Sequence, residues 1–419
     1  MPRTILLLTA LAVVTLTACD EQAPAAVGPS PSLAESRSSV VQPTTGPWAR
    51  IIEGSTGPGA QYALHIPREW NGDAVYYAHG FRDIDSPVDL RDQDQFYAFR
   101  DALGAEGYAV AFSSYSRNGF AIKDGAQRVH QLRGLLASRL GAQPTRHFLA
   151  GHSLGGGIAL ALAERYPDQY DGALLVCGMV GGSLLQTQYL GHVRALADAF
   201  FPGAFPGNVN AVPPGTVITL PQVVAAVQSN PTGLFAIASM AQSPLPGVPS
   251  GNPLDPNGVT FQTLVGSLYA GVSFHARGIN DIVDLTPGDA PFDNAQTTYA
   301  LHASPWLPAV ALAPAVGFAN AAVTRYSADV QSTKYLERHF TPTGALQMPV
   351  LTLHNAWDPA VPAFHESALA ALAAEAGASG NLLQRTALSY GHCNIPPSMV
   401  LQGFQDLAAW RTSGVRPAQ

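Results

Sequence analysis

A serine between two glycines, at the junction of an apolar run and a segment rich in alanine and leucine, constrains this chain more than any other feature. The stretch at 147–153 is short and apolar enough for a buried strand, and residues 158–165 have the composition of a helix. Gly151 and Gly155 each stand two residues from Ser153, where a sharp turn leaves little room for side chains. The pattern predicts a strand, a tight turn that exposes Ser153, and a helix.

The position of this serine makes it a candidate nucleophile. The helix that begins after Ser153 directs free N–H groups and its positive dipole end toward the turn, which favours an oxyanion. The alternative is an ordinary glycine-rich connection between a strand and a helix. Chemistry at Ser153 therefore requires a base and an orienting acid elsewhere in the chain.

The rest of the chain alternates between strands and helices. This alternation predicts an α/β protein with a mainly parallel sheet that helices cover on both faces. An antiparallel pair at 48–53 and 61–66 opens the domain. The further strands are expected at 74–81, 108–115, 147–153, 172–177, 348–354 and 382–390, and the helices at 92–106, 124–140, 154–166, 363–376 and 398–411.

The alternation stops between the strand at 172–177 and the strand at 348–354. Residues 179–341 are dense in proline, glycine and alanine and contain apolar segments without a convincing strand. A stretch of this length is better interpreted as an inserted, mainly helical cap than as a loop. The predicted core therefore has two parts, residues 47–178 and 342–415.

The N-terminal residues have the pattern of an export signal. Residues 1–19 combine an early arginine, an apolar segment and the ending Leu-Thr-Ala-Cys19. This ending resembles the lipobox of bacterial lipoproteins, which implies a lipid anchor at Cys19 and a place in the cell envelope, attached to the membrane. The alternative is a cysteine that follows an ordinary cleavage site. Residues 20–46 are rich in Pro, Ala and Ser, a composition typical of a disordered tether.

Charge argues against polyanionic partners. The formal net charge is −7, and no run of lysine and arginine stands out. Nucleic acid is therefore not an expected partner.

Three short motifs at the ends of three predicted strands resemble those of the α/β-hydrolase family. They are Gly-His-Ser153-Leu-Gly, Asp358-Pro-Ala-Val-Pro and Gly391-His392, in the family's order of nucleophile, acid and histidine. The resemblance covers roughly residues 48–178 and 348–411 and leaves the cap unmatched. It implies that His392 is the base that activates Ser153 and that Asp358 orients it.

The resemblance also implies an oxyanion hole of two backbone N–H groups. One belongs to Leu154, directly after the nucleophile. The turn His79-Gly80-Phe81 resembles the family's His-Gly oxyanion loop, which places the second donor at Phe81. The ring of Phe81 is then either a wall of the acyl pocket or a core aromatic.

Other acids and histidines are weaker candidates. No strand positions the cap acids Asp281, Asp284, Asp289 and Asp293, so they are expected to be solvated loop and cap residues. His354 lies in or just after a strand and His365 opens a helix, while His152 is expected to support the turn. The pair His365-Glu366 lacks a second histidine at the zinc-protease spacing, and no metal or cofactor is expected.

Cys177 and Cys393 are the cysteines that remain after Cys19. In the expected fold both lie near the same rim of the sheet, so a disulfide between them and two free thiols are both open. Cys393 next to His392 resembles a subgroup of feruloyl esterase and tannase-like hydrolases in which a disulfide ties the nucleophile segment to the histidine segment. This chain departs from the subgroup, because His152 and not cysteine precedes Ser153.

The leading functional hypothesis is a serine hydrolase that cleaves carboxylic esters through an acyl-enzyme on Ser153. A cap rich in Leu, Val, Phe and Pro suggests apolar or aromatic ester substrates, small or polymeric. The second hypothesis is a capped serine peptidase of the same fold, in which acidic cap residues hold the substrate amine. The third is a lipoprotein that uses an inactive hydrolase fold to bind a ligand or partner.

Overall fold

The computed structural model describes residues 40–42, 46–244, 261–286, 290–302 and 309–418. The predicted signal, Cys19 and most of the predicted tether lie outside the described residues. Within them, no helix combines the length and the apolar character that crossing a membrane requires.

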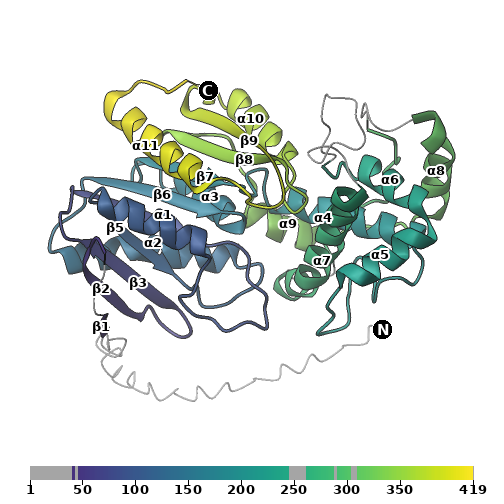
Figure 1. The fold of residues 1–419 in the computed structure, drawn as a ribbon, viewed down its shortest axis with the longest axis horizontal. Helices are drawn as coiled ribbons and strands as arrows, with labels where there is room; N and C mark the ends of the chain where they lie inside the picture. Colours follow the sequence, from purple (N-terminus) through teal and green to yellow (C-terminus); the bar gives the residue numbers. More distant parts are fainter. Residues whose placement is uncertain (1–39, 43–45, 245–260, 287–289, 303–308, 419) are drawn as a thin grey trace, which may run out of the picture. The chain divides into compact units, whose positions relative to one another are not determined.

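The core is a nine-stranded sheet in the order β1-β2-β3-β5-β4-β6-β7-β8-β9 (Figure 1). Its first edge is antiparallel, and β3 also pairs with β5 in antiparallel fashion. The other six strands are parallel, which confirms the mainly parallel sheet. The strands are β1 (Val40–Gln42), β2 (Trp48–Ser55), β3 (Gln61–Pro67), β4 (Asp73–Ala78), β5 (Ala109–Ser113), β6 (Arg146–His152), β7 (Gly172–Val176), β8 (Val350–Trp357) and β9 (Leu382–Tyr390).

Two expectations for the strands are wrong. The tether was expected to extend through residue 46, but β1 pairs with β2 from Val40 opposite Glu53. A free strand edge offers unpaired backbone groups to such a segment, whatever the composition around it. Strand β8 also continues past residue 354, because its pairing with β9 resumes at Trp357 opposite Tyr390 after an irregularity.

Two layers of helices cover the sheet. Helices α2 (Ile122–Leu140), α3 (Leu154–Arg165) and α10 (Phe364–Glu375) contribute to the hydrophobic cluster on one face. Helices α1 (Asp94–Ala105) and α11 (Pro397–Ser413) contribute to the cluster on the other. In β6, Phe148 belongs to the second cluster and its neighbour Leu149 to the first, because successive side chains of a strand point to opposite faces.

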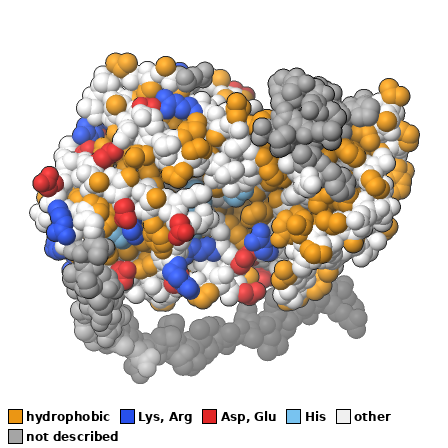
Figure 2. Space-filling model, viewed as in Figure 1, with side chains coloured by type: hydrophobic (Ala, Val, Ile, Leu, Met, Phe, Trp, Pro, Cys, Tyr) orange, Lys and Arg blue, Asp and Glu red, His pale blue; other side chains and the backbone are white. Residues whose placement is uncertain are grey.

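The segment between β7 and β8 is helical wherever it has regular structure in the described residues. It has its own hydrophobic cluster, in which Leu196, Val223 and Leu268 are buried. On the face drawn in Figure 2, charged side chains are scarce over this part of the molecule. Its helices are α4 (Ser183–Phe200), α5 (Leu220–Ser229), α6 (Pro231–Met240), α7 (Phe261–Leu285), α8 (Ala309–Ala322) and α9 (Val330–Arg338).

Buried polar contacts join the cap to the core. Asp281 of α7 is 2 % exposed, binds Arg117 and accepts from the backbone N–H of Phe120. From α4, the Gln186 amide and the Tyr189 hydroxyl donate to the backbone oxygens of residues 360 and 359. The cap therefore supports the loop that follows β8.

Candidate active site

Ser153 occupies the turn between β6 and α3 in a backbone conformation that residues other than glycine rarely adopt. Its φ is 54° and its ψ is −122°. Two of its backbone hydrogen bonds are with the segment around the end of β7: its N–H donates to the oxygen of Val176 at 2.9 Å, and its oxygen accepts from the N–H of Met179 at 3.1 Å. Such strain persists only where the surroundings over-determine the conformation.

The flanking glycines are required by contacts with backbone. A Cβ atom on Gly151 would lie 2.2 Å from the oxygen of Gly155, and one on Gly155 would lie 2.1 Å from the oxygen of Ala78. Real Cβ contacts are not this short, so neither position accepts a side chain without a shift of backbone. The steric reason for the two glycines agrees with the sequence prediction.

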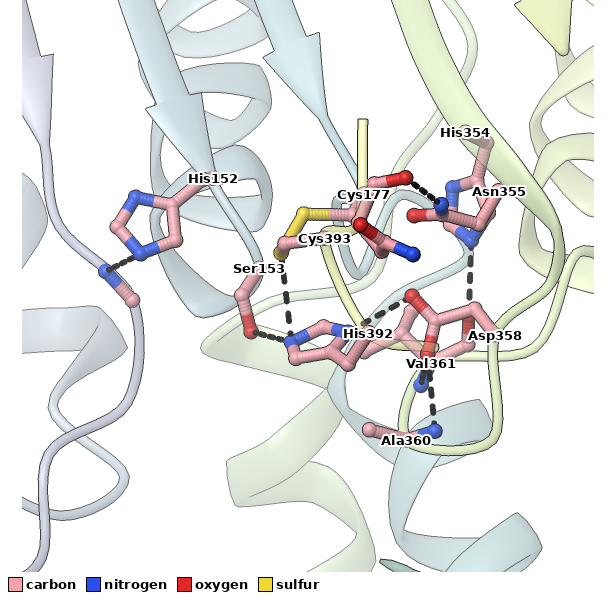
Figure 3. The surroundings of a disulfide bond; sticks show 12 residues. His152, Ser153, Cys177, His354, Asn355, Asp358, Ala360, Val361, His392 and Cys393 are labelled. Carbon is pink, nitrogen blue, oxygen red and sulfur yellow. Dashed lines mark hydrogen bonds and ion pairs between the residues drawn. A yellow bond between two sulfur atoms is a disulfide. The ribbon is translucent and has the colours of Figure 1, made fainter. Parts of the chain in front are cut away.

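The structure brings Ser153, His392 and Asp358 together at the carboxyl edge of the sheet (Figure 3). His392 follows β9, and its Nε2 lies 2.8 Å from the Oγ of Ser153. Its Nδ1 lies 2.7 Å from the Oδ2 of Asp358, which follows β8 and is fully buried. Oδ1 of Asp358 accepts from the backbone N–H groups of Ala360 and Val361 at 2.9 and 3.0 Å.

These contacts fix how the imidazole of His392 can act. The carboxylate of Asp358 can only accept hydrogen bonds. Neutral His392 therefore carries its proton on Nδ1 and donates a hydrogen bond from Nδ1 to Asp358. The lone pair of Nε2 then faces the hydroxyl of Ser153. The arrangement can take a proton from Ser153 and stabilise the resulting imidazolium.

The turn after β4 lies directly against the nucleophile. A Cβ on Gly80 would lie 3.2 Å from the Cβ of Ser153 and 2.7 Å from the Nε2 of His152, so glycine permits this close approach. Phe81 follows in the turn and lines the cleft above Ser153. Leu154 is the first residue of α3. Both predicted oxyanion donors therefore belong to backbone that flanks Ser153.

His152 supports both sides of this arrangement. Its Nε2 accepts from the N–H of Gly80 at 3.2 Å, and its Nδ1 bonds to the hydroxyl of Tyr77. Burial, with smaller contributions from the charges of His392 and Arg82, lowers the pKa of His152 to about 3. It is therefore neutral at pH 7 and can accept from Gly80. The sequence suggests support for the turn, but not this contact with the neighbouring loop.

A disulfide joins Cys177 to Cys393, with 5.2 Å between the Cα atoms. Cys177 follows Val176 and precedes Met179, the two residues whose backbones hold Ser153, while Cys393 directly follows His392. The bridge therefore links the support of the nucleophile to the loop of the histidine. The two sulfur atoms and a ring nitrogen of His392 lie within 4.8 Å of one another, but disulfide sulfurs are not the thiolates that bind metals.

A cleft of about 590 Å³ opens above Ser153. Gly80, Phe81 and Asp83 line it from the core, and Phe274 and Arg277 line it from α7 of the cap. The rings of Phe274 and His392 meet edge to face with centroids 5.9 Å apart. No motif marks these cap residues in the sequence, since only tertiary packing brings α7 to the histidine.

The rival residues have other partners. His354 lies inside β8, where it contacts Glu366 and the backbone oxygen of Val361. His365 accepts from the N–H of Gly181 and bonds to Gln186.

The rival cap acids do not line the cleft above Ser153. Asp281 binds the core, exposed Asp284 lies one turn further along α7, and Asp293 accepts from backbone N–H groups at 295 and 328. Asp289 lies outside the described residues.

Comparison with known proteins points to hydrolases. A family model described as serine aminopeptidase, S33, matches residues 102–238, about a third of the chain. A monoacylglycerol lipase of Mycolicibacterium smegmatis is 27% identical over 164 residues, which are 38% of this chain and 55% of the lipase. The chain thus spans about half the length of this curated relative.

Solved structures with a similar arrangement include two enzymes and a hydrolase described as putative. The feruloyl esterase B of Aspergillus oryzae has a TM-score of 0.47 at 15% identity, with 92% of this chain and 85% of that chain covered. A putative hydrolase of Legionella pneumophila has a TM-score of 0.45 at 15% identity, with 88% and 90% covered. The esterase LipA of Xanthomonas oryzae has a TM-score of 0.42 at 13% identity, with 86% and 91% covered.

The fold assignment depends on the molecule itself. The nucleophile candidate stands on a strand-to-helix turn of a mainly parallel sheet, and the acid and the histidine follow later strands in the order typical of this fold. The matched family model covers the nucleophile turn and the first cap helices. The chain has the α/β-hydrolase fold, with a helical cap between β7 and β8, and part of it is similar in sequence to a monoacylglycerol lipase.

Proposed function

We propose that the protein hydrolyses carboxylic esters through an acyl-enzyme on Ser153. The observation that carries the proposal is the unbroken series of contacts from Ser153 Oγ to His392 Nε2 at 2.8 Å and from His392 Nδ1 to Asp358 Oδ2 at 2.7 Å. A serine hydroxyl is a weak nucleophile by itself, and an adjacent, oriented base is what activates it.

In the first half of the reaction, Oγ of Ser153 attacks the ester carbonyl while Nε2 of His392 takes the hydroxyl proton. The negative charge that develops on the carbonyl oxygen is stabilised by the N–H groups of Leu154 and Phe81. Asp358 stabilises the imidazolium without taking its proton. His392 then returns the proton to the leaving alcohol, and the acyl group remains on Ser153.

In the second half, a water molecule takes the place of the alcohol. His392 removes a proton from this water, the resulting hydroxide attacks the acyl carbonyl, and the proton returns to Ser153 as the acid leaves. The His392 loop lines the cleft, so the leaving alcohol and the incoming water both pass through this cleft to reach His392.

The lining of the cleft supports a substrate with both apolar and polar parts. Phe81 and Phe274 form apolar walls, but charged side chains such as Asp83 and Arg277 line the same cleft. The Leu and Val residues of the cap, including Leu196 and Leu268, are largely buried in the cap's own cluster. The composition of the cap is therefore no guide to the substrate, and we narrow the expectation of apolar or aromatic esters to esters that also carry a polar group.

Replacement of the nucleophile tests the proposal. We expect Ser153→Ala to lower kcat for 4-nitrophenyl butyrate by at least about 10³-fold and to abolish labelling by a fluorophosphonate probe. The thermal midpoint should stay within a few degrees of that of the wild type, because the hydroxyl makes no contact needed for folding. Steady-state kinetics, mass spectrometry of the labelled protein and a thermal scan measure the three effects.

Ser116→Ala is a matched control, since Ser116 is a core serine that donates to Asp124 away from the cleft. It should keep full labelling at Ser153. A folded wild-type protein that no fluorophosphonate labels and that hydrolyses no ester would contradict the proposal and favour a binding protein with an inactive hydrolase fold.

A serine peptidase is the second candidate, because the matched family model is described as a serine aminopeptidase. None of the described cap acids lines the cleft, so no carboxylate pair of the cap is placed to hold a substrate amine there. Parallel assays with nitrophenyl esters and aminoacyl nitroanilides separate the two candidates. Hydrolysis of the anilides alone would reverse their order.

We also propose that the protein is exported and anchored to the membrane by a lipid on Cys19. The support is the sequence Leu-Thr-Ala-Cys19 after an apolar segment. In a bacterial host, metabolic labelling with a palmitate analogue should mark the wild type but not Cys19→Ala. Equal labelling of both proteins would refute the anchor.

A further inference from the structure

Three arginines line the cleft above Ser153, and they differ in how firmly they are paired. Arg82 donates to the backbone oxygen of Asp89 at 2.7 Å with only 16% of its side chain exposed. Arg91 binds the carboxylate of the same aspartate through Nε at 2.6 Å. Arg277 donates at 3.3 and 3.5 Å to the two oxygens of Asp83 and at 3.4 Å to the backbone oxygen of Ser273, and 39% and 47% of the side chains of Arg277 and Asp83 are exposed.

Arg277 also lies near the reacting groups. It is one helical turn from Phe274 on α7, and its Cζ lies 4.5 Å from the centroid of the Phe274 ring. Phe274 also contacts His392, and the centroids of these two rings are 5.9 Å apart. A single aromatic ring thus separates the guanidinium from the imidazole, and a substrate at Ser153 can reach both along the same cleft.

An exposed ion pair of this kind contributes little to stability, because water screens its charges. A guanidinium fork binds a carboxylate best with two parallel hydrogen bonds, which the long contacts with Asp83 do not provide. An incoming carboxylate can therefore displace Asp83. Each of the three arginines has a carboxylate partner, Asp92, Asp89 or Asp83, and Asp83 of the Arg277 pair is the most exposed of these partners.

We propose that Arg277 forms an anion subsite that binds a carboxylate carried by the ester substrate. When no substrate is bound, the carboxylate of Asp83 is the partner of the Arg277 guanidinium. The carboxylate can belong to the acyl portion, as in a monoester of a dicarboxylic acid, or to the alcohol portion. The subsite rests on the proposed function for turnover, but not for binding.

Two pairs of esters of similar size test the subsite. The acyl pair is 4-nitrophenyl hemiglutarate against 4-nitrophenyl hexanoate, and the alcohol pair is 4-carboxyphenyl acetate against 4-carbamoylphenyl acetate. In at least one pair, we expect the wild type to hydrolyse the ester with a carboxylate faster than its neutral partner. That pair shows whether Arg277 binds a carboxylate of the acyl portion or of the alcohol portion. Arg277→Gln should lower kcat/KM for the preferred anion about tenfold, through KM, and leave the neutral partner within about twofold.

Two further variants sharpen the test. Asp83→Asn should raise kcat/KM for the anionic ester, because it removes the competing carboxylate. Arg277→Lys should fall between wild type and Arg277→Gln, because it keeps the charge and loses the fork. Arg338→Gln, an exposed arginine of α9 outside the cleft lining, is the matched control and should leave the preference unchanged. Added salt should weaken the preference of the wild type.

Two kinetic results would overturn the subsite. One is a wild type that prefers neither carboxylate. The other is an Arg277→Gln variant with kcat lowered equally for anionic and neutral esters, which would show that Arg277 acts through Phe274 and His392 and not on the substrate.

A binding measurement separates failure of the subsite from failure of the proposed function. Calorimetry on the Ser153→Ala protein should detect monomethyl glutarate but not dimethyl glutarate, and adding Arg277→Gln should remove the signal. If the wild type hydrolyses no ester and this binding is present, the subsite stands and the proposed function falls. If esters are hydrolysed without discrimination and no anion binds, the subsite falls and the proposed function stands.

Discussion

Contacts of single atoms explain the residues around Ser153. Ser153 has a positive φ that costs roughly 1–3 kcal/mol, and two backbone hydrogen bonds hold it there. Gly151 and Gly155 let the neighbouring backbone approach closely enough to make this turn. Gly157 is only two residues further along the chain, but a Cβ there would meet nothing closer than 3.4 Å. Adjacent glycines in one motif therefore have different roles.

We expect Gly155→Ala to destabilise the protein by about 3 kcal/mol, because its Cβ would overlap the backbone oxygen of Ala78. Gly157→Ala is the matched control. It should leave stability unchanged or raise it by up to about 1 kcal/mol, since alanine favours a helix over glycine. Urea unfolding followed by circular dichroism measures both. Equal stability of the two variants would contradict the steric explanation of the motif.

At the scale of elements, the reacting groups belong to loops that three different strands present at one edge. The disulfide between Cys177 and Cys393 joins the histidine loop to the loop after β7, whose backbone holds Ser153, and closes a segment of 216 residues. Other contacts also hold the histidine loop, such as the 3.0 Å bond from the N–H of Gly391 to the oxygen of Trp357. Loss of the disulfide should therefore make the histidine loop more mobile but leave it folded.

We expect Cys177→Ser/Cys393→Ser to lower the free energy of unfolding by at most roughly 5 kcal/mol, the chain-entropy value for a closed loop of this length. At a temperature where the variant is folded, kcat should fall while KM for a neutral ester changes little, because the bridge aligns His392 with Ser153 and does not line the whole cleft. Reduction of the wild type with a phosphine should reproduce both effects, and reoxidation should reverse them. A variant with unchanged kcat would limit the bridge to stability.

At the scale of the whole molecule, buried neutral histidines couple folding to pH. Burial is the largest cause that lowers the pKa of five histidines to about 3, namely His65, His79, His152, His275 and His365. The unfolded chain binds protons at these residues near pH 6.5, whereas the folded chain does not until about pH 3. Their contribution is complete above pH 6.5 and is lost as pH falls toward 3.

Other groups act in the opposite sense. Burial lowers the pKa of His354, but the hydrogen bond and charge of Glu366, together with the charge of Asp358, outweigh it and raise that pKa. Its contribution is present below pH 6.5 and is lost as pH rises through the raised value. Burial also raises the pKa of carboxyl groups such as Asp92 and Glu164, so the folded chain binds their protons more readily. Five histidines therefore act in one direction, and His354 and these carboxyl groups act in the other.

We therefore expect stability to fall steeply between pH 6.5 and 5.5, by on the order of 1 kcal/mol for each of the five histidines. The total is comparable with the whole stability of an ordinary domain. Urea midpoints measured at pH 7.5, 6.5 and 5.5 test this.

His65→Phe is a suitable control variant. His65 lies between the rings of Trp48 and Phe112, so phenylalanine fits the site and removes one titrating group. The slope of stability against pH should then fall by about one proton. A wild-type midpoint that does not change over this range would contradict the effect of burial.

The local structure and the chemical groups of the candidate site are predictable from the amino-acid sequence. Hydrophobic periodicity and glycine spacing act over a few residues, so the strand-to-helix turn at Ser153, strand β9 and the helical character of the cap are all predictable. Motifs at strand ends also indicate His392 and Asp358, because parallel strands end at one edge of the sheet.

The residues that face these groups across the cleft are known only from the packing of the folded chain. Strand β1 forms because the free edge of β2 offers hydrogen-bond partners, and nothing near residue 40 specifies that pairing. His152 contacts Gly80, and α7 brings Phe274 against His392 and Arg277 into the same cleft, through contacts between segments far apart in the chain. Such contacts depend on how whole layers pack, and a local pattern carries no information about its distant partner.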